Sequence, residues 1–393
     1  MVRHRKNGIF PSESRAHFLS FSFIAVAFWL VPHAFAQAGT NPAAKSEADI
    51  LIFANGDRLT GKLERSDGSK LIFKTEMAGE ITVEWKTVKE LHTNREFAVI
   101  PNGVNVKTGE NPAKIPQGTL RVENQQIQLS NPGGVAEQTI PASDSAYIVD
   151  KPTFDNAISN HERLYQAWNG SVTLGTSLVD ATQRSNMLSG AADLLRLTPQ
   201  ENWLDRRDRT AVNVSFAYGM LTQPNTPDVK TDIYHLDAER DEYFTSRLFA
   251  FGVISYDHNF SQGLDLQHSY GAGVGWTVVK NPDNELNLRT SVNYLKEQFQ
   301  QADLNQNLIG SAFGENYMHR FAHKIVLKEQ GMVTPAWNNT SAYSASGQLG
   351  LSIPLYKRFS LALTSVDTFI NNPPVGFKKN SVQFTTGLTY SMK

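Results

Sequence analysis

Residues 381–392 read Ser381-Val-Gln-Phe-Thr-Thr-Gly-Leu-Thr-Tyr-Ser-Met392, and this stretch decides the fold class. Every second side chain from Val382 onward is large or apolar, and the side chains between them are small or polar. Alternate side chains of a β-strand point to opposite faces, so this strand has one apolar face and one polar face. The pattern predicts a wall that separates an apolar environment from water.

The same alternation recurs at nearly even spacing back to about Trp168 and predicts twelve strands. Their predicted spans are 167–178, 185–197, 208–221, 230–242, 246–259, 265–280, 284–297, 309–319, 322–333, 341–354, 358–371 and 379–392. Bacterial single-chain barrels have an even strand count, although weak alternation in some spans leaves ten or fourteen strands open. We therefore predict an all-β chain whose residues 167–393 form an antiparallel outer-membrane β-barrel, the alternative being a soluble all-β protein.

The direction of the alternation supports the membrane interpretation. Lipid requires apolar side chains on the outside of a barrel, and water permits small and polar side chains in the lumen. Seven polar residues at inward positions are our candidate lumen-lining residues: Asp193, Asn213, Asp237, Glu239, Arg289, Asn293 and Glu297. They would either set an ion preference, close the lumen by cross-linking it, or only fill it.

The N-terminus has the layout of a cleavable secretory signal. Basic residues precede an apolar run from Phe18 to Val31, which leads to the small-residue site Ala34-Phe35-Ala36. We predict a signal peptide over residues 1–36, with an uncleaved anchor as the alternative, and a linker over residues 37–48. The chain contains no cysteine, which excludes disulfides and a lipoprotein anchor.

Residues 49–150 predict a small β domain. Its short β-rich runs are separated by Asn55-Gly56 and Asp67-Gly68, which favour tight hairpin turns. A weaker echo aligns Gly118-Thr-Leu-Arg with Gly61-Lys-Leu-Glu, so we interpret the domain as an SH3-like or Sm-like unit that is possibly duplicated. Residues 151–166 are predicted to link it to the barrel.

An exported N-terminal domain and an even strand count place both barrel ends in the periplasm. Connections after even-numbered strands should then be the short ones, as at Asn281 to Asp283 and Leu355 to Lys357. Thr198 to Arg207 is the longer exception, and its many charges indicate a solvated loop.

Two further groups of residues have the composition of a binding site. Gly271, Gly273 and Gly275 lie inside one strand with no helix after it, so the nucleotide-loop context is missing. Inward glycines that curve the wall or keep the lumen open are the preferred interpretation. A metal site at His319 and His323, with Glu315 and Glu329 nearby, has no evident third ligand. Solvated side chains are the preferred interpretation.

No catalytic residue, metal or cofactor is predicted. His268 and Ser269 are adjacent in a strand and therefore face opposite sides, which prevents them from partnering as in a hydrolase. Charges nearly cancel, with 37 basic and 38 acidic residues, so nucleic acid is not an expected partner.

Three segments carry a resemblance to a known family: residues 247–260, residues 264–276 with the Gly-x-Gly-x-Gly-Trp pattern, and residues 286–299. With the closing strand, they resemble the bacterial salt-induced outer membrane proteins of the YdiY type over about residues 167–393. The resemblance implies an outer-membrane barrel of unknown biochemical activity and supplies no catalytic residues.

The sequence predicts a non-enzymatic protein of a Gram-negative-type outer membrane with a periplasmic N-terminal domain. A narrow solute or ion channel, or an envelope-stabilising protein, is the preferred function. The alternatives are an outer-membrane lipid hydrolase and a barrel that anchors a protein-binding module. Expected partners are outer-membrane lipid, the barrel-assembly machinery and a periplasmic protein.

Overall fold

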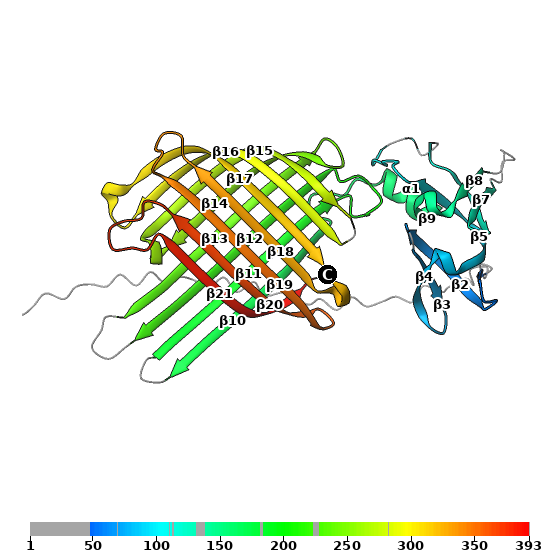
Figure 1. Ribbon diagram of the computed structural model, residues 1–393, viewed down its shortest axis with the longest axis horizontal. Helices are drawn as coiled ribbons and strands as arrows, with labels where there is room; N and C mark the ends of the chain where they lie inside the picture. Colours follow the sequence, from blue (N-terminus) through cyan, green and yellow to red (C-terminus); the bar gives the residue numbers. More distant parts are fainter. Residues whose placement is uncertain are drawn as a thin grey trace, which may run out of the picture. The chain divides into compact units, whose positions relative to one another are not determined.

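The computed structural model describes residues 48–68, 70–109, 111, 114–130, 138–180, 184–222, 228–281 and 283–392. The predicted signal peptide, and all but the last residue of the linker predicted after it, lie outside the described residues. In the described ranges, no helix is long and apolar enough to cross a bilayer. Two β structures make up most of the described chain, a small sheet over residues 49–150 and a barrel over residues 168–391 (Figure 1).

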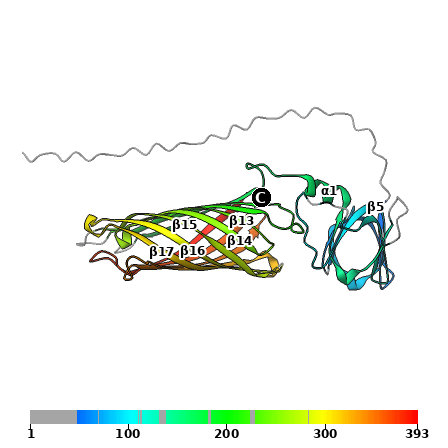
Figure 2. The same ribbon diagram turned by 90° about the horizontal axis from the view of Figure 1, so that it is seen from above.

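The small domain is one nine-stranded sheet that curls around its own core (Figure 2). Its elements are β1 (Asp49–Phe53), β2 (Arg58–Asp67), β3 (Lys70–Thr75), β4 (Gly79–Glu84), the 3₁₀ turn η1 (Trp85–Thr87), β5 (Val88–Pro101), β6 (Gln117–Glu123), β7 (Gln126–Ser130), β8 (Gln138–Pro141), the 3₁₀ turn η3 (Ala142–Asp144) and β9 (Ser145–Asp150). The strand order is β4-β3-β2-β1-β5-β6-β7-β8. β2 and β5 are longer than β1, which lies between them. Beyond the end of β1, β9 pairs with both β2 and β5.

The same order of elements occurs twice in this domain. Three strands, a 3₁₀ turn and a fourth strand run from β2 to β5 and again from β6 to β9. A Cβ atom on Gly61 would lie 2.2 Å from the carbonyl oxygen of Lys74, and one on Gly118 would lie 2.7 Å from that of Ser130. Equivalent positions also supply the core: Leu63 and Leu120, Leu71 and Ile127, Phe73 and Leu129, Val83 and Ile140, and Trp85 and Ala142. This correspondence supports the duplication that the sequence suggests.

Helix α1 (Lys151–Ser159) occupies the first part of the segment predicted as a linker, residues 151–166. The side chain of Asp150 accepts a hydrogen bond from a backbone N–H in the first turn, which satisfies one of the free donors of the helix N-terminus. Phe154 and Ile158 are four residues apart and therefore share one face, which is buried in an apolar cluster.

Twelve antiparallel strands close the barrel, and the last strand pairs with the first (Figure 1). They are β10 (Trp168–Asp180), β11 (Arg184–Thr198), β12 (Asp208–Thr222), β13 (Val229–Tyr243), β14 (Leu248–Asn259), β15 (Leu264–Lys280), β16 (Asn284–Phe299), β17 (Gln306–Arg320), β18 (Val326–Pro335), β19 (Tyr343–Tyr356), β20 (Phe359–Ile370) and β21 (Asn380–Ser391). The predicted strand count and antiparallel barrel are confirmed.

Burial along β21 shows which face points outward. Val382 and Phe384 are 67% and 65% exposed, whereas Gly387 and Thr389 on the other face are buried. The same division continues through the register of the other strands, for example at Val292, which is 52% exposed. An apolar outer face and a polar inner face, with every strand edge paired, form the architecture of an outer-membrane barrel.

The connections differ in length between the two ends of the barrel. Four connections are short, at residues 244–247, 281–283, 321–325 and 357–358, and they follow β13, β15, β17 and β19, the even-numbered strands when β10 is counted as the first strand of the barrel. Those at the other end include residues 223–228, 260–263, 300–305, 336–342 and 371–379. These connections follow the predicted pattern of short and long ends, whereas residues 181–183 after β10 and 199–207 after β11 depart from it.

The connection over residues 199–207 is not the solvated loop that its charges predict. Trp203 and Leu204 are buried, and the Trp203 ring stacks on Phe154 of α1 with their centroids 5.3 Å apart. Arg206 pairs with Glu285. The prediction was wrong because it counted the charges and gave no weight to the two apolar side chains among them.

Candidate functional site

The barrel lumen holds all seven candidate residues. The registers of β11, β12, β13 and β16 place each of them on the inward face, opposite the exposed apolar set. They do not form one group. Glu239 and Arg289 meet directly, Asp193, Asn213 and Asp237 lie level with one another on neighbouring strands, and Asn293 and Glu297 lie further along β16.

A buried arginine cluster, defined as Arg209, Glu239, Asp241 and Arg289, lies in the lumen. Arg209 Nη1 lies 2.5 Å from Glu239 Oε1 and 2.8 Å from Asp241 Oδ2, and Arg289 Nη2 pairs with the other Glu239 oxygen. Arg289 belongs to β16 and Glu239 to β13, with β14 and β15 between them. The contact therefore passes through the interior of the barrel rather than along its wall.

Aromatic rings support this arginine cluster. The Arg289 guanidinium lies over the ring of Phe251, 4.1 Å from its centroid, and Phe249 packs beside Phe251 and Tyr243. A guanidinium on an aromatic face gains a cation–π attraction that grows as water is excluded. Both phenylalanines point inward from β14, where sequence alternation predicted small and polar residues.

The glycines of β15 make room for these side chains. A Cβ atom on Gly275 would lie 2.1 Å from Cζ of Phe249, and one on Gly271 would lie 2.5 Å from Oδ1 of Asn293. The glycines face inward, as predicted, but they do not keep the lumen open. Neighbouring side chains occupy the space that they leave.

The arginine cluster is balanced in charge and has little exposure to water. Glu239 and Asp241 are 7% and 1% exposed, and two guanidinium groups face two carboxylates. Removal of one partner from a buried ion pair usually costs about 3–5 kcal/mol, because the remaining charge is left uncompensated. The cluster therefore cross-links this side of the lumen.

A second polar group, the mid-lumen arc, consists of Asp193, Asn213, His235, Asp237 and Asp257. The Asn213 amide donates to Asp237 at 2.9 Å, and the His235 ring lies 2.9 Å from Asp237 and 2.6 Å from Asp257. Asp193 accepts a hydrogen bond from the nearby Ser171 hydroxyl at 3.0 Å. Two carboxylates, Asp237 and Asp257, thus share one imidazole, and Asp193 lies level with Asp237 on the inner face of β11 to β14.

The opposite side of the lumen, which we call the small-residue wall, is formed by β17 to β21 and by β10 as far as Thr176. Its inward positions are mostly Ser, Thr, Gly, Ala, Gln and Asn. Among these described positions, the charged side chains are Arg320 and Lys328. Gln330, Met332 and Gln348 face inward and are nevertheless exposed, so side chains of the opposite wall do not cover them.

Arg206, in the connection over residues 199–207, contacts β13 and β16 at the end of the barrel with the short turns. Arg206 Nη1 lies 3.1 Å from Glu285 Oε1 and 3.2 Å from the Tyr243 hydroxyl oxygen. Burial lowers the pKa of the Arg206 guanidinium, but Tyr243 and Glu285 outweigh burial and hold that pKa above its ordinary value. The loop is thus fixed by a permanent positive charge.

The structure does not bring together the residues considered for a metal site or for a hydrolase. The His319 ring bonds to the Asn284 side chain at 2.7 Å, and in the described residues no three or more His, Asp or Glu side chains are arranged so that they could hold a metal ion. His268 faces outward beside Tyr256, with ring centroids 5.1 Å apart, and its neighbour Ser269 faces inward. As expected from strand geometry, these two side chains do not meet.

Sequence reasoning missed several lumen residues: Arg206, Arg209, His235, Asp241, Phe249, Phe251, Asp257 and Glu285. Alternation was a sufficient signal for Arg209, His235 and Asp241. Each lies an even number of residues from a candidate on the same strand, Asn213 in β12 or Asp237 in β13, and therefore faces the same side. No local signal identifies the phenylalanines, because both faces of β14 carry apolar residues.

A family model described as "Protein of unknown function, DUF481" matches residues 172–392 of this chain. No curated protein matches the chain. Similar solved structures include an outer membrane channel from Pseudomonas putida F1, with TM-score 0.35 and 9% identity over 59% of this chain and 100% of that one. The translocator domain of autotransporter NalP from Neisseria meningitidis has TM-score 0.33 and 13% identity, covering 61% and 92%. An anion-selective porin from Comamonas acidovorans has TM-score 0.27 and 9% identity, covering 57% and 98%. With TM-scores below 0.5, none of these three supports an argument about the function of this chain.

Proposed function

We propose that this chain, a member of the DUF481 family of proteins of unknown function, forms a narrow channel for small solutes or ions. Membership of the family assigns no activity by itself. The one-sided filling of the lumen supports this proposal. The arginine cluster and its aromatic supports occupy the β12 to β16 side, while Gln330 and Gln348 on the small-residue wall remain exposed. Water along one wall would pass small ions, and the packed side would exclude large solutes.

We also propose that the barrel spans the outer membrane of a Gram-negative-type bacterium, with its short turns and the small domain in the periplasm. The short connections of bacterial outer-membrane barrels face that side. In this arrangement, the barrel-assembly machinery inserts the barrel into outer-membrane lipid, and the small domain binds a periplasmic protein.

Reconstitution of the full chain in a planar lipid bilayer tests the channel proposal. We expect discrete, small conductance steps from folded protein, with folding checked by heat-dependent mobility on a denaturing gel. Folded protein that produces no steps would contradict channel activity.

Absence of conductance steps from folded protein would favour the second candidate, a structural role in the envelope. The specific observation for this role is the buried arginine cluster, which joins β12, β13 and β16 across the lumen. A barrel with this role would resist unfolding without conducting ions.

The remaining alternatives have separate tests. A lipid hydrolase would release fatty acid from phospholipid vesicles, and substitution of one serine would abolish the release. A barrel that only anchors a binding module would retain an envelope partner on co-purification, and deletion of residues 49–150 would lose it. The resemblance to salt-induced proteins stays a prediction, tested by comparing expression at low and high salt.

A further inference from the structure

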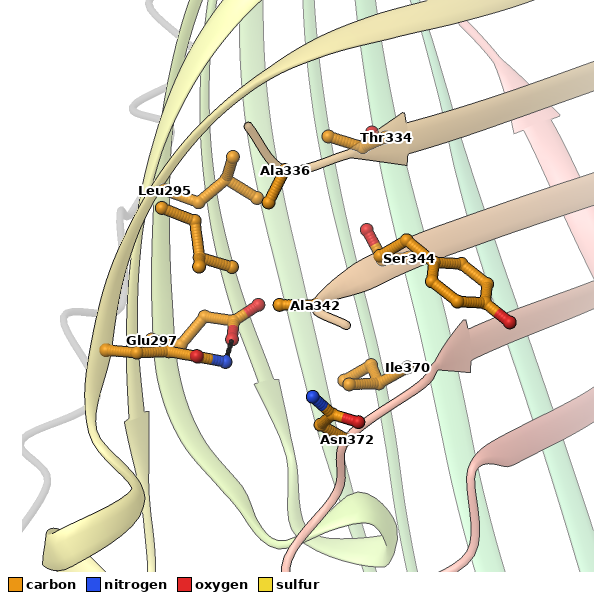
Figure 3. A pocket seen from close by; sticks show the side chains of 11 residues that line it. Leu295, Glu297, Thr334, Ala336, Ala342, Ser344, Ile370 and Asn372 are labelled. Carbon is orange, nitrogen blue, oxygen red and sulfur yellow. Dashed lines mark hydrogen bonds between the residues drawn. The ribbon is translucent and has the colours of Figure 1, made fainter. Parts of the chain in front are cut away.

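A small cavity lies inside the barrel at the end with the longer connections (Figure 3). Its volume of about 10 Å³ accommodates one water-sized occupant. It is lined by side chains from β16 to β20 and the connections next to them: Leu295, Glu297, Gln306, Leu308, Thr334, Ala336, Ala342, Tyr343, Ser344, Ile370 and Asn372. Of these lining residues, only Glu297 is an acidic or basic residue.

Glu297 is 3% exposed, and amide groups hold both of its carboxylate oxygens. Gln267 Nε2 donates to Oε1 at 2.8 Å, and Gln306 Nε2 donates to Oε2 at 2.7 Å. In the described part of the chain, no lysine, arginine or histidine forms an ion pair or hydrogen bond with this carboxylate. The arginine cluster lies at the opposite end of the lumen and already balances its own charges.

This geometry suits an ionised carboxylate that lacks its counter-charge. An ionised carboxylate only accepts hydrogen bonds, and here each oxygen accepts one from an NH₂ group that has no acceptor capacity of its own. Removing such a charge from water without a partner is costly, and buried charges are usually paired or bound to a metal ion. A cation in the adjoining cavity would remove that cost.

The lining also indicates the kind of cation. Beyond Glu297, the polar groups of the cavity are neutral, and Figure 3 shows Thr334, Ser344 and Asn372 grouped around it with Glu297. Calcium sites usually combine several carboxylates with six to eight oxygen ligands, whereas one carboxylate with neutral oxygens balances a single positive charge. We propose that this cavity binds one small monovalent cation of the size of Na⁺ or K⁺, with Glu297 as its counter-charge.

Thermal unfolding of the full chain in detergent micelles tests the proposal and does not depend on channel activity. The midpoint is measured while KCl replaces N-methylglucamine chloride at constant ionic strength. Because a ligand that binds only the folded state stabilises it in proportion to ln(1 + [K⁺]/Kd), we expect the wild-type midpoint to rise with the logarithm of K⁺ concentration. N-methylglucamine is too large for the cavity, so it provides the matched cation background.

Glu297→Gln keeps the size of the side chain and removes its charge, and we expect it to abolish the K⁺-dependent rise. Glu329→Gln is the matched control, because Glu329 is exposed and lies outside the cavity, and it should retain the rise. If the first variant does not fold, Ala342→Leu fills the cavity with Glu297 intact and should also lose the rise. A wild-type midpoint that does not respond to K⁺, or a rise that survives in folded Glu297→Gln or Ala342→Leu, would overturn the proposal.

Discussion

Replacement of Arg289 by methionine is expected to destabilise the barrel by about 3 kcal/mol. In the wild type, the four charges of the arginine cluster cancel, and Glu239 is shared by two guanidinium groups. After the substitution, Arg209 alone faces two carboxylates that are 7% and 1% exposed, so one negative charge is left buried. Methionine is unbranched and packs well against an aromatic ring, so loss of contact with Phe251 contributes little.

A double-mutant cycle with Glu239→Leu separates this charge effect from simple loss of contacts. Removal of both partners leaves Arg209 and Asp241 as a balanced pair, 2.8 Å apart. We therefore expect the double variant Arg289→Met, Glu239→Leu to lose at least about 2 kcal/mol less than the sum of the single losses. The assay is urea unfolding from lipid vesicles, followed by tryptophan fluorescence at fixed pH and salt. A single-variant loss below about 1 kcal/mol, or additive losses, would refute the reasoning.

Three further predictions concern other parts of the chain. Gly275→Val should destabilise the barrel by about 1–3 kcal/mol, because its Cβ would lie 2.1 Å from a buried phenylalanine ring, while Gly252→Ala, with nothing within 4 Å, should be neutral; equal unfolding midpoints would contradict this. Val292→Arg, on the lipid-facing side at 52% exposure, should cost about 2–4 kcal/mol in a bilayer, whereas Gln348→Arg should fold as wild type, and equal losses would reverse the assigned faces. Asp49→Asn should lower the stability of the small domain by about 1–3 kcal/mol, because Asp49 is 1% exposed and pairs at 2.8 Å with the guanidinium of Arg95. A variant whose thermal transition in near-ultraviolet circular dichroism equals that of the wild-type full chain would argue against this prediction.

Strand positions in the barrel were predictable because their signal is local. A period of two residues is visible in any short segment, so the predicted span 265–280 nearly coincides with β15 (Leu264–Lys280). Parity within a strand also places a residue on the inner face once one apolar neighbour is known to point outward. That argument was enough to place all seven candidate residues on the inward face.

Contacts across the lumen could not be read from the sequence. Arg289 meets Glu239 only because the barrel wall curves over the two strands between them. The two-residue alternation of a strand gives the side on which a residue lies and does not give this curvature. Phe249 and Phe251 were missed because β14 carries apolar residues on both faces, which removes the inside-outside signal. The buried Trp203 was missed because surrounding charges suggested a solvated loop, whereas burial depends on a distant apolar cluster.

In the small domain, turn chemistry and the internal echo predicted more than strand periodicity did. Asn55-Gly56 and Asp67-Gly68 mark hairpin turns where glycine adopts positive φ, at 91° and 61°. The echo identified equivalent core positions, such as Leu63 and Leu120. The pairing of β9 with both β2 and β5 was not predictable, because it depends on strand lengths that only the assembled sheet defines.

The central claim, that a water path follows the small-residue wall, is tested most directly by cysteine accessibility in a conducting barrel. The chain has no cysteine, so each substitution introduces the only thiol. We predict that Gln348→Cys reacts with a charged, membrane-impermeant thiosulfonate and loses conductance, while Leu349→Cys on the lipid-facing side and Asn293→Cys in the packed wall stay unmodified. Protection of Gln348→Cys, or modification that leaves the current unchanged, would contradict the account.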